Sequence, residues 1–301
     1  MLDFKKNKKL AIAFLLPAFA FYIIFMISPV FETAFLSFFK WRGIGGSEFS
    51  FIGLRNYVKV FTDPKFWTSF GRLIYFVVIS VVSQMVIGFI LAYLVSLKLK
   101  GSRFFKLTFF LPAVLSVTAV SLMWKMILST NEGMLNMLLN NMGLGTLARS
   151  WLTDPDICFT VITLINTWLQ VGMPFVILLA GLIGIPGELY EAAAIDGANS
   201  WNMVFKITIP MMKEILAVAT ILVLSNSMKA FDVFYVITSG TFGPGEANMV
   251  PMGYMYITSF RGNDFGRGSV MALFVMLVGA IASVFVYFKG FQGKKGDASD
   301  D

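Results

Sequence analysis

Histidine is absent from this sequence of 301 residues, and cysteine occurs once, at Cys158. A single thiol cannot form an intrachain disulfide, and a chain without histidine has neither the usual Cys/His zinc sites nor imidazole acid-base catalysis. The chain also lacks the Gly-x-x-x-x-Gly-Lys-Ser/Thr phosphate loop, so we do not expect it to hydrolyse ATP. We find no nucleophile-base or metal constellation, and these absences together argue against an enzyme.

Charged residues are scarce, because they make up 14% of the chain against about a quarter in water-soluble domains. Apolar residues make up 57% and are gathered into long runs, and the mean hydropathy is +0.77. This composition predicts one all-α membrane domain in a lipid bilayer. The net charge of +7 could suggest a nucleic-acid partner, but the cations cluster at the ends of apolar runs, where they orient membrane spans, so we expect no nucleic acid.

The N-terminus imitates a signal peptide, because several lysines precede an apolar run that contains Ala18-Phe19-Ala20, a small-residue cleavage pattern. The run continues to about Val30, however, and so supplies the roughly 20 residues that a membrane span needs. We therefore expect an uncleaved first helix.

Six segments have the length and composition of transmembrane helices, for which roughly 17 to 25 mainly apolar residues are required. They lie near residues 10–30, 73–97, 105–128, 157–183, 215–237 and 268–288, and together they predict a membrane domain over 10–288. An even number of spans places both termini on one side. Clustered cations before the first span, after the second and after the sixth mark that side as cytoplasmic, with a short segment at 1–9 and a disordered tail at 289–301.

The segment 184–213, cytoplasmic by this count, has the punctuation of a helical elbow. Pro186 and Gly187 end the preceding span, and Glu188 lies in a first helical turn, where the helix dipole favours an acid. We expect a short helix from about Glu188 to Asp196, a turn at Gly197, and a second helical segment up to Pro210. The residues alone leave two alternatives open: a docking surface for another protein, or a merely connecting or re-entrant amphipathic loop.

Three fragments of this elbow resemble the EAA motif of permease subunits of bacterial ATP-binding-cassette importers. They are Glu191-Ala192-Ala193, then Asp196-Gly197-Ala198, then Ile207-Thr208-Ile209-Pro210, in which Ile209 replaces the usual leucine. Further fragments resemble the first permease of the carbohydrate branch, which includes the maltose and glycerol-phosphate importers. These fragments are Phe51-Ile52-Gly53-Leu54-Arg55-Asn56-Tyr57, Asn166-Thr167-Trp168 and Phe231-Asp232-Val233-Phe234-Tyr235.

The resemblance implies a type I importer permease in the bacterial cytoplasmic membrane that carries a sugar through a pathway shared with a homologous second permease. Two separate ATPase subunits would use ATP and magnesium, this chain would bind no cofactor, and an extracytoplasmic solute-binding protein would deliver the carbohydrate. The residues that would couple the chain to the ATPase are Glu188, Glu191, Ala192, Ala193, Asp196, Gly197, Ala198 and Pro210.

Polar residues inside the spans are candidates for the pathway, since they are costly in lipid unless they line a cavity or bond to other helices. Asn166, Gln170 and Met173 recur on one face of the fourth span, and Ser227 and Asp232 interrupt the fifth.

Two lysines in the spans can be explained without a role in the pathway. Lys229 and Asp232 are three residues apart and can form an ion pair on one helical face, and Lys125, beside Trp124, can extend to the membrane interface.

The rival function is an ion-coupled secondary transporter, but we find no clear internal repeat, and Asp232 is the only carboxylate well inside a span.

Overall fold

The computed structural model describes residues 8–43, 45, 48–97 and 100–291. This part of the chain is helical except for its loops and one two-stranded antiparallel sheet, in which Phe39 pairs with Phe51. The fold is that of an all-α protein, as the composition predicts. The chain divides into two compact units, Met1–Trp67 with Tyr254–Val275, and Thr68–Gly253 with Met276–Asp301.

The first unit begins with a long apolar helix and continues through a hairpin into short helices. Its elements are α1 (Lys8–Tyr22), a π-helical stretch (Ile23–Ile27), α2 (Ser28–Leu36), β1 (Phe39–Lys40), β2 (Ser50–Phe51), α3 (Arg55–Phe61) and a second π-helical stretch (Ile257–Arg261). Three helices cross the boundary between the units along the chain: α4 (Pro64–Ser96), α15 (Pro251–Tyr256) and α16 (Phe265–Phe291).

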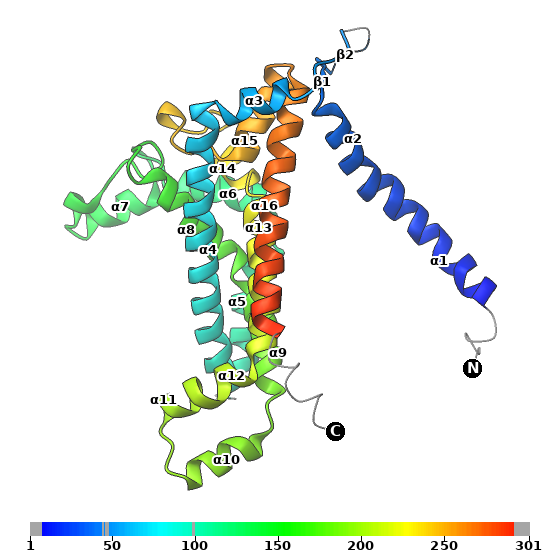
Figure 1. Cartoon of the computed structure of the whole chain (residues 1–301). Coiled ribbons are helices and arrows are strands. Elements are labelled where there is room, and N and C mark those ends of the chain that lie inside the picture. Colours follow the sequence, from blue (N-terminus) through cyan, green and yellow to red (C-terminus); the bar gives the residue numbers. More distant parts are fainter. Residues whose placement is uncertain (1–7, 44, 46–47, 98–99, 292–301) are drawn as a thin grey trace. The chain divides into compact units, whose positions relative to one another are not determined.

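α1 and α2, with the π-helical stretch between them, form a continuous helical rod (Figure 1). Its segment Phe14–Leu36 is long and apolar enough to cross a membrane, and none of the residues in its most apolar stretch is fully buried. Elsewhere in this unit Val60, Phe66, Val270 and Met271 form a small buried core. Asp63 lies beside that core. Its carboxylate accepts hydrogen bonds from the Tyr254 hydroxyl at 2.5 Å and the Arg267 guanidinium at 3.1 Å, and burial together with this carboxylate raises the pKa of Tyr254 to about 12.

The second unit contains the bent helices and the elbow. Besides the larger parts of α4 and α16, its elements are α5 (Ser102–Val114), α6 (Val117–Ile127), α7 (Met134–Asn141), α8 (Cys158–Gln170), α9 (Gly172–Ile183), α10 (Gly187–Ile195), α11 (Ser200–Asn202), a π-helical stretch (Met203–Thr208), α12 (Ile209–Met211), α13 (Lys213–Met228) and α14 (Asp232–Ile237), with short 3-10 turns at Gly145–Leu147 and Pro244–Glu246.

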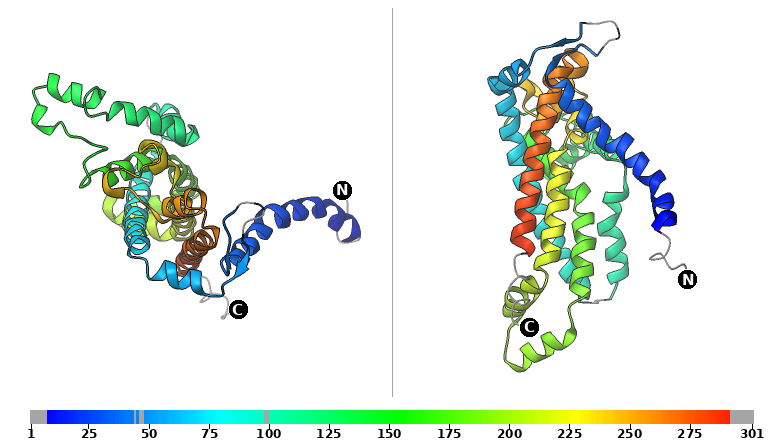
Figure 2. Two further views of the ribbon diagram at one scale, coloured as in Figure 1. Left: turned by 90° about the horizontal axis from the view of Figure 1, so that it is seen from above. Right: turned by 45° about the vertical axis from the view of Figure 1, so that its right-hand side comes forward.

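The core of the second unit forms where α4, α9 and α13 meet. Ala92 and Val95 from α4, four apolar residues of α9, Met212 and Ala219 are all buried there. α5 lies beside α9 (Figure 2) and comes very close at Gly172. A methyl group at Gly172 would lie 2.9 Å from the Ala113 side chain and 3.1 Å from the Phe109 carbonyl oxygen, so only glycine allows this approach.

Among the described residues, three helices are long and apolar enough to cross a membrane, and three bent helix pairs reach that length together. Residues 105–128, expected as one straight span, instead form α5 and α6 at 96° to each other, because Leu115 and Ser116 between them are extended. α8 and α9 bend by 45° at Val171, directly before Gly172 and Pro174. The fifth predicted span, 215–237, is also divided, because α13 ends at Met228 and α14 begins at Asp232.

The expected tail needs one correction, since α16 continues to Phe291 and residues 289–291 are therefore helical rather than disordered. The remainder of that tail, 292–301, lies outside the described residues, as do residues 1–7 of the predicted N-terminal segment. Lys8 and Lys9 already belong to α1.

Candidate functional site: an exposed elbow and a polar cavity

The two arms of the predicted elbow are present, with α10 as the first arm and α11 to α12 as the second (Figure 1). α9 ends at Ile183, and α10 begins directly after Pro186, whose backbone is extended, and carries Glu188 in its first turn. It runs from Gly187 to Ile195, which agrees closely with the expected helix from Glu188 to Asp196.

Gly197 turns the chain by a specific motif. Its φ of +77° lies in the left-handed region, its N–H donates to the Ala194 carbonyl at 3.1 Å, and the N–H of Ala198 donates to the Ala193 carbonyl at 2.9 Å. This pair of bonds is the Schellman arrangement that satisfies the last carbonyls of a helix. The glycine in this motif is therefore required by backbone geometry, whatever binds to the surface.

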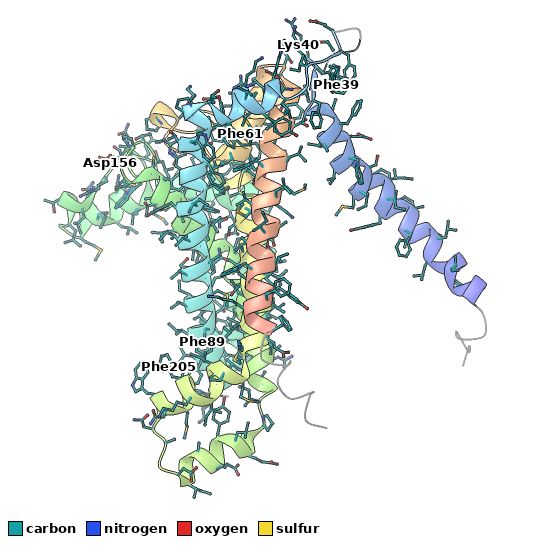
Figure 3. All side chains as sticks on the ribbon, viewed as in Figure 1. Phe39, Lys40, Phe61, Phe89, Asp156 and Phe205 are labelled. Carbon is teal, nitrogen blue, oxygen red and sulfur yellow. The ribbon has the colours of Figure 1, made fainter. Side chains whose placement is uncertain are left out.

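The second arm begins at Asn199, whose side chain caps it by accepting a hydrogen bond from the Asn202 N–H at 2.8 Å. The arm passes through a π-helical stretch and Pro210 before it ends at Met211, one residue beyond the expected end. On this arm the rings of Trp201 and Phe205 stack with their centroids 5.7 Å apart, and both are largely exposed. Phe205 is labelled on the second arm in Figure 3.

A hydrogen bond holds the two arms together. The hydroxyls of Tyr190 on α10 and Thr208 on the second arm lie 3.0 Å apart, and Thr208 is completely buried. Sequence reasoning missed both this contact and the Asn199 cap. The asparagine before a helical segment is the signal that could have found the cap, whereas nothing local indicates the partner of Tyr190.

The surface of α10 is suited to contact with another protein, because none of its residues is buried. Glu188, Glu191, Ala192 and Asp196 are exposed, Ala193 and Ala198 are half-buried, and Gly197 has open space on its outer side. The alanines leave a narrow surface that a partner backbone can approach closely, and the acids at its edge can bind basic groups. Ile195 is 87% exposed beside them, although the sequence analysis did not single it out.

The five predicted pathway residues line one cavity of about 310 Å³ in the second unit. Asn166 and Gln170 reach it from α8, Met173 from α9, Ser227 from α13 and Asp232 from α14. They meet because the α8–α9 bend and the gap between α13 and α14 lie along the same cavity. The structure thus brings together all five residues that the sequence predicted for the pathway.

Other polar groups of the cavity are Gln84 from α4, Asn226 and Lys229, and the aromatic side chains of Phe76 and Phe231 also line it. Gln84 is buried and was missed, because one glutamine in an apolar span gives only a weak signal. Neutral amides and hydroxyls beside aromatic walls can bind a ligand that is rich in hydroxyl groups.

The expected ion pair of Lys229 and Asp232 is wrong. Lys229 caps the end of α13 and Asp232 opens α14, so the two residues are not on one continuous helical face. No ion pair joins them in the part of the chain that the structure describes, although both line the cavity. The ammonium group of Lys125, which was expected to extend to the membrane interface, donates to the Ser239 hydroxyl.

Comparisons with known proteins agree on one family. Residues 64–289 match the family model described as "Binding-protein-dependent transport system inner membrane component". A probable ABC transporter permease protein, YurN, of Bacillus subtilis is 37% identical over 96% of this chain and 98% of its own length. The multiple sugar-binding transport system permease protein MsmF of Streptococcus mutans is 32% identical over 92% of this chain and 94% of its own.

The fold is also similar to that of a solved structure. A chain in the crystal structure of a bacterial alginate ABC transporter, in complex with a periplasmic protein that holds an alginate pentasaccharide, superimposes with a TM-score of 0.82. The match covers 97% of both chains at 21% sequence identity.

Proposed function

This chain belongs to the family of inner membrane components of binding-protein-dependent transport systems, and we propose that it is a permease subunit of an ATP-driven sugar importer. Relatives that align over nearly the whole chain are named as permeases for multiple sugars and for trehalose and maltose. The carried substrate is accordingly a mono- or oligosaccharide. The chain forms the translocation pathway together with a homologous second permease.

The exposed elbow carries this proposal. Its first arm buries none of its own residues, ends in a glycine turn with open space outside, and joins the second arm through Tyr190 and Thr208. A helix with these properties is not covered within its own chain, and its shape suits a cleft in a partner protein. We assign it to a separate ATPase subunit, with Glu188, Glu191 and Asp196 at the rim and Ala192, Ala193 and Gly197 at the centre of contact.

The energy for transport comes from that partner. The sequence has no phosphate loop, so ATP and magnesium belong to the ATPase subunits, and this chain acts by transmitting their closure. Because the second arm leads directly into α13, displacement of the elbow would move the helix that carries Asn226 and Ser227 into the cavity. Alternating exposure of the cavity to the two sides of the membrane follows from this connection.

The cavity is the proposed sugar pathway. Asn166, Gln170 and Ser227 supply donors and acceptors for hydroxyl groups, and the nearby aromatic walls supply apolar contact. The elbow and both termini lie on the cytoplasmic side in this scheme, as the clustered lysines predict. The opposite side receives the sugar from a solute-binding protein.

Purification of the tagged chain from its native membrane in mild detergent tests the proposal. We expect a second permease and an ATPase to copurify. Reconstituted in lipid vesicles, the complex should hydrolyse ATP and import sugar, and both activities should increase when the solute-binding protein is added. A stable preparation without any ATPase that still transports with an ion gradient would reject the proposal and favour a secondary transporter.

A further inference from the structure

A second cavity of the second unit, of about 560 Å³, shares no lining residue with the proposed sugar pathway. It is built by the end of α6, the loop that follows α6, the loop before α8, and the loop that follows α14. Its polar lining includes Lys125, Ser129, Thr130, Asn131 and Thr153. Its volume lies in the range of small-molecule sites.

One wall of this cavity is a loop with an unusual backbone. Ser239, Phe242 and Glu246 all have φ between +54° and +59°, which is uncommon for residues with a side chain. Two threonines hold the loop. Thr238 donates its hydroxyl to the Phe234 carbonyl at 2.7 Å and accepts from the Phe242 N–H at 3.0 Å, and Thr241 donates to the Thr238 carbonyl at 2.7 Å.

The same loop is anchored by burial, because Phe242 is completely buried. The Arg72 side chain also donates a hydrogen bond to the Glu246 carbonyl at 2.8 Å. Left-handed residues persist only where the surroundings fix them, and they gather at binding sites. This wall is therefore shaped in advance and does not depend on a ligand for its form.

The opposite wall offers hydrogen-bonding groups that are not used within the protein. Among the described residues, the side chains of Ser129, Thr130, Asn131 and Thr153 have no hydrogen-bond partner. They lie along the two loops that face the wall of residues 237–244. The backbone of the first loop is fixed from outside the cavity, since Asn136 donates to the Thr130 carbonyl at 3.1 Å and itself accepts from the Trp151 ring N–H at 2.8 Å.

Lys125 gives the cavity its charge. Its ammonium group donates to the Ser239 hydroxyl, which leaves two N–H bonds without a partner in the described part of the chain. No described carboxylate lines the cavity, so the ammonium charge is not neutralised there. The pathway cavity differs in this respect, because it contains Asp232 as well as Lys229.

We propose that this second cavity is a binding site for a small acidic saccharide, with its carboxylate on Lys125 and its hydroxyls on Ser129, Thr130, Asn131 and Thr153. An ammonium ion in a cavity whose described lining contains no carboxylate favours an anion, and the neutral hydroxyl and amide groups favour a polyhydroxylated ligand. The volume is many times that of one water molecule, about 30 Å³, and so exceeds what an inorganic anion needs. The site is additional to the transport pathway and does not rest on the proposed function.

Equilibrium binding tests this site without any transport assay. D-glucuronate and D-glucose are titrated by calorimetry into the full chain in lipid nanodiscs, with the subunits that copurify and without the solute-binding protein. We expect saturable binding of glucuronate and at least tenfold weaker binding of glucose. Lys125→Met should weaken glucuronate binding at least tenfold, and Thr153→Val should weaken it several-fold by removing one exposed hydroxyl without altering the loop backbone.

Lys59→Met is the matched control, because Lys59 is an exposed lysine of α3 outside the cavity, and glucuronate binding should be unchanged. Unaltered affinity in both Lys125→Met and Thr153→Val would overturn the proposal. Loss of binding in Asn166→Leu but not in Lys125→Met would place glucuronate in the pathway cavity and overturn it as well. Displacement of glucuronate by sulfate at equal affinity would show an anion site and exclude recognition of the saccharide.

Discussion

The hydroxyl oxygens of Tyr190 and Thr208 lie 3.0 Å apart and join the two arms of the elbow across 18 positions of sequence. Thr208 donates its own proton to the Met203 carbonyl at 3.0 Å, so Tyr190 is the donor in the contact between the arms. The bond fixes how α10 is presented relative to the helix that leads into α13. A coupling surface needs such a connection, since a loosely held α10 would absorb the motion of its partner.

Removal of this bond should impair coupling more than assembly. Tyr190→Phe removes one hydrogen bond worth about 0.5–1.5 kcal/mol and keeps the ring. We expect the complex to assemble, and sugar imported per ATP hydrolysed to fall several-fold in reconstituted vesicles. Tyr93→Phe is the matched control, because the Tyr93 hydroxyl has no hydrogen-bond partner among the described residues. Equal transport ratios in the two variants would show that the bond has no role in coupling.

Substitutions at Gly197 can distinguish its role in the turn from its role in the surface that contacts a partner. Asparagine tolerates φ near +77°, so Gly197→Asn should keep the turn while adding a side chain where a partner approaches. We expect normal folding with reduced recovery of the ATPase during purification. Gly197→Val should also strain the turn by about 1–2 kcal/mol. Gly143 has φ +75° and equally open surroundings, and Gly143→Asn should leave ATPase recovery at the wild-type level.

The elbow could be predicted from sequence because each of its parts has a local cause. Pro186 immediately precedes the first helical residue, Gly197 permits a left-handed conformation, and a run of alanines favours a helix between them. The hydropathy of a segment, in contrast, does not indicate whether its helix changes direction. Residues 105–128 are apolar throughout, so they appeared as one span although Leu115 and Ser116 turn the chain by 96°.

Asn166 tests the assignment of the pathway cavity. Asn166→Leu keeps a similar size but replaces an amide that lines the cavity with an apolar side chain. We predict at least a tenfold loss of sugar uptake in vesicles while the ATPase still copurifies. Asn141→Leu, the same change at an exposed position of α7, should transport normally. Normal uptake by Asn166→Leu would remove α8 from the pathway.

Gly172 sets how closely α5 approaches the bend between α8 and α9. A methyl group there would lie 2.9 Å from the Ala113 side chain, so Gly172→Ala should destabilise the unit by roughly 1–3 kcal/mol through overpacking. The single cysteine provides the measurement, because Cys158 is completely buried and reacts with a maleimide dye only after unfolding. The labelling midpoint on heating should fall by several degrees, whereas Gly71→Ala, with open space around it, should not lower it.

The cavity was only partly accessible to sequence reasoning. Periodicity placed Asn166, Gln170 and Met173 on one face because that stretch of α8 and the start of α9 is helical, as expected. The same reasoning failed for Lys229 and Asp232, since neither glycine nor proline marks the break between α13 and α14. Tertiary packing decides that break, and it cannot be read from the local pattern.

Site-specific photo-crosslinking tests the central claim, that α10 contacts an ATPase subunit, most directly. A photoreactive phenylalanine analogue replaces Ile195, which is 87% exposed on α10, or Met142, which is 71% exposed just after α7. On irradiation of cells, we predict a covalent product between position 195 and an ATP-binding-cassette ATPase, and no such product from position 142. Absence of the ATPase product at 195, or equal products at both positions, would contradict the account.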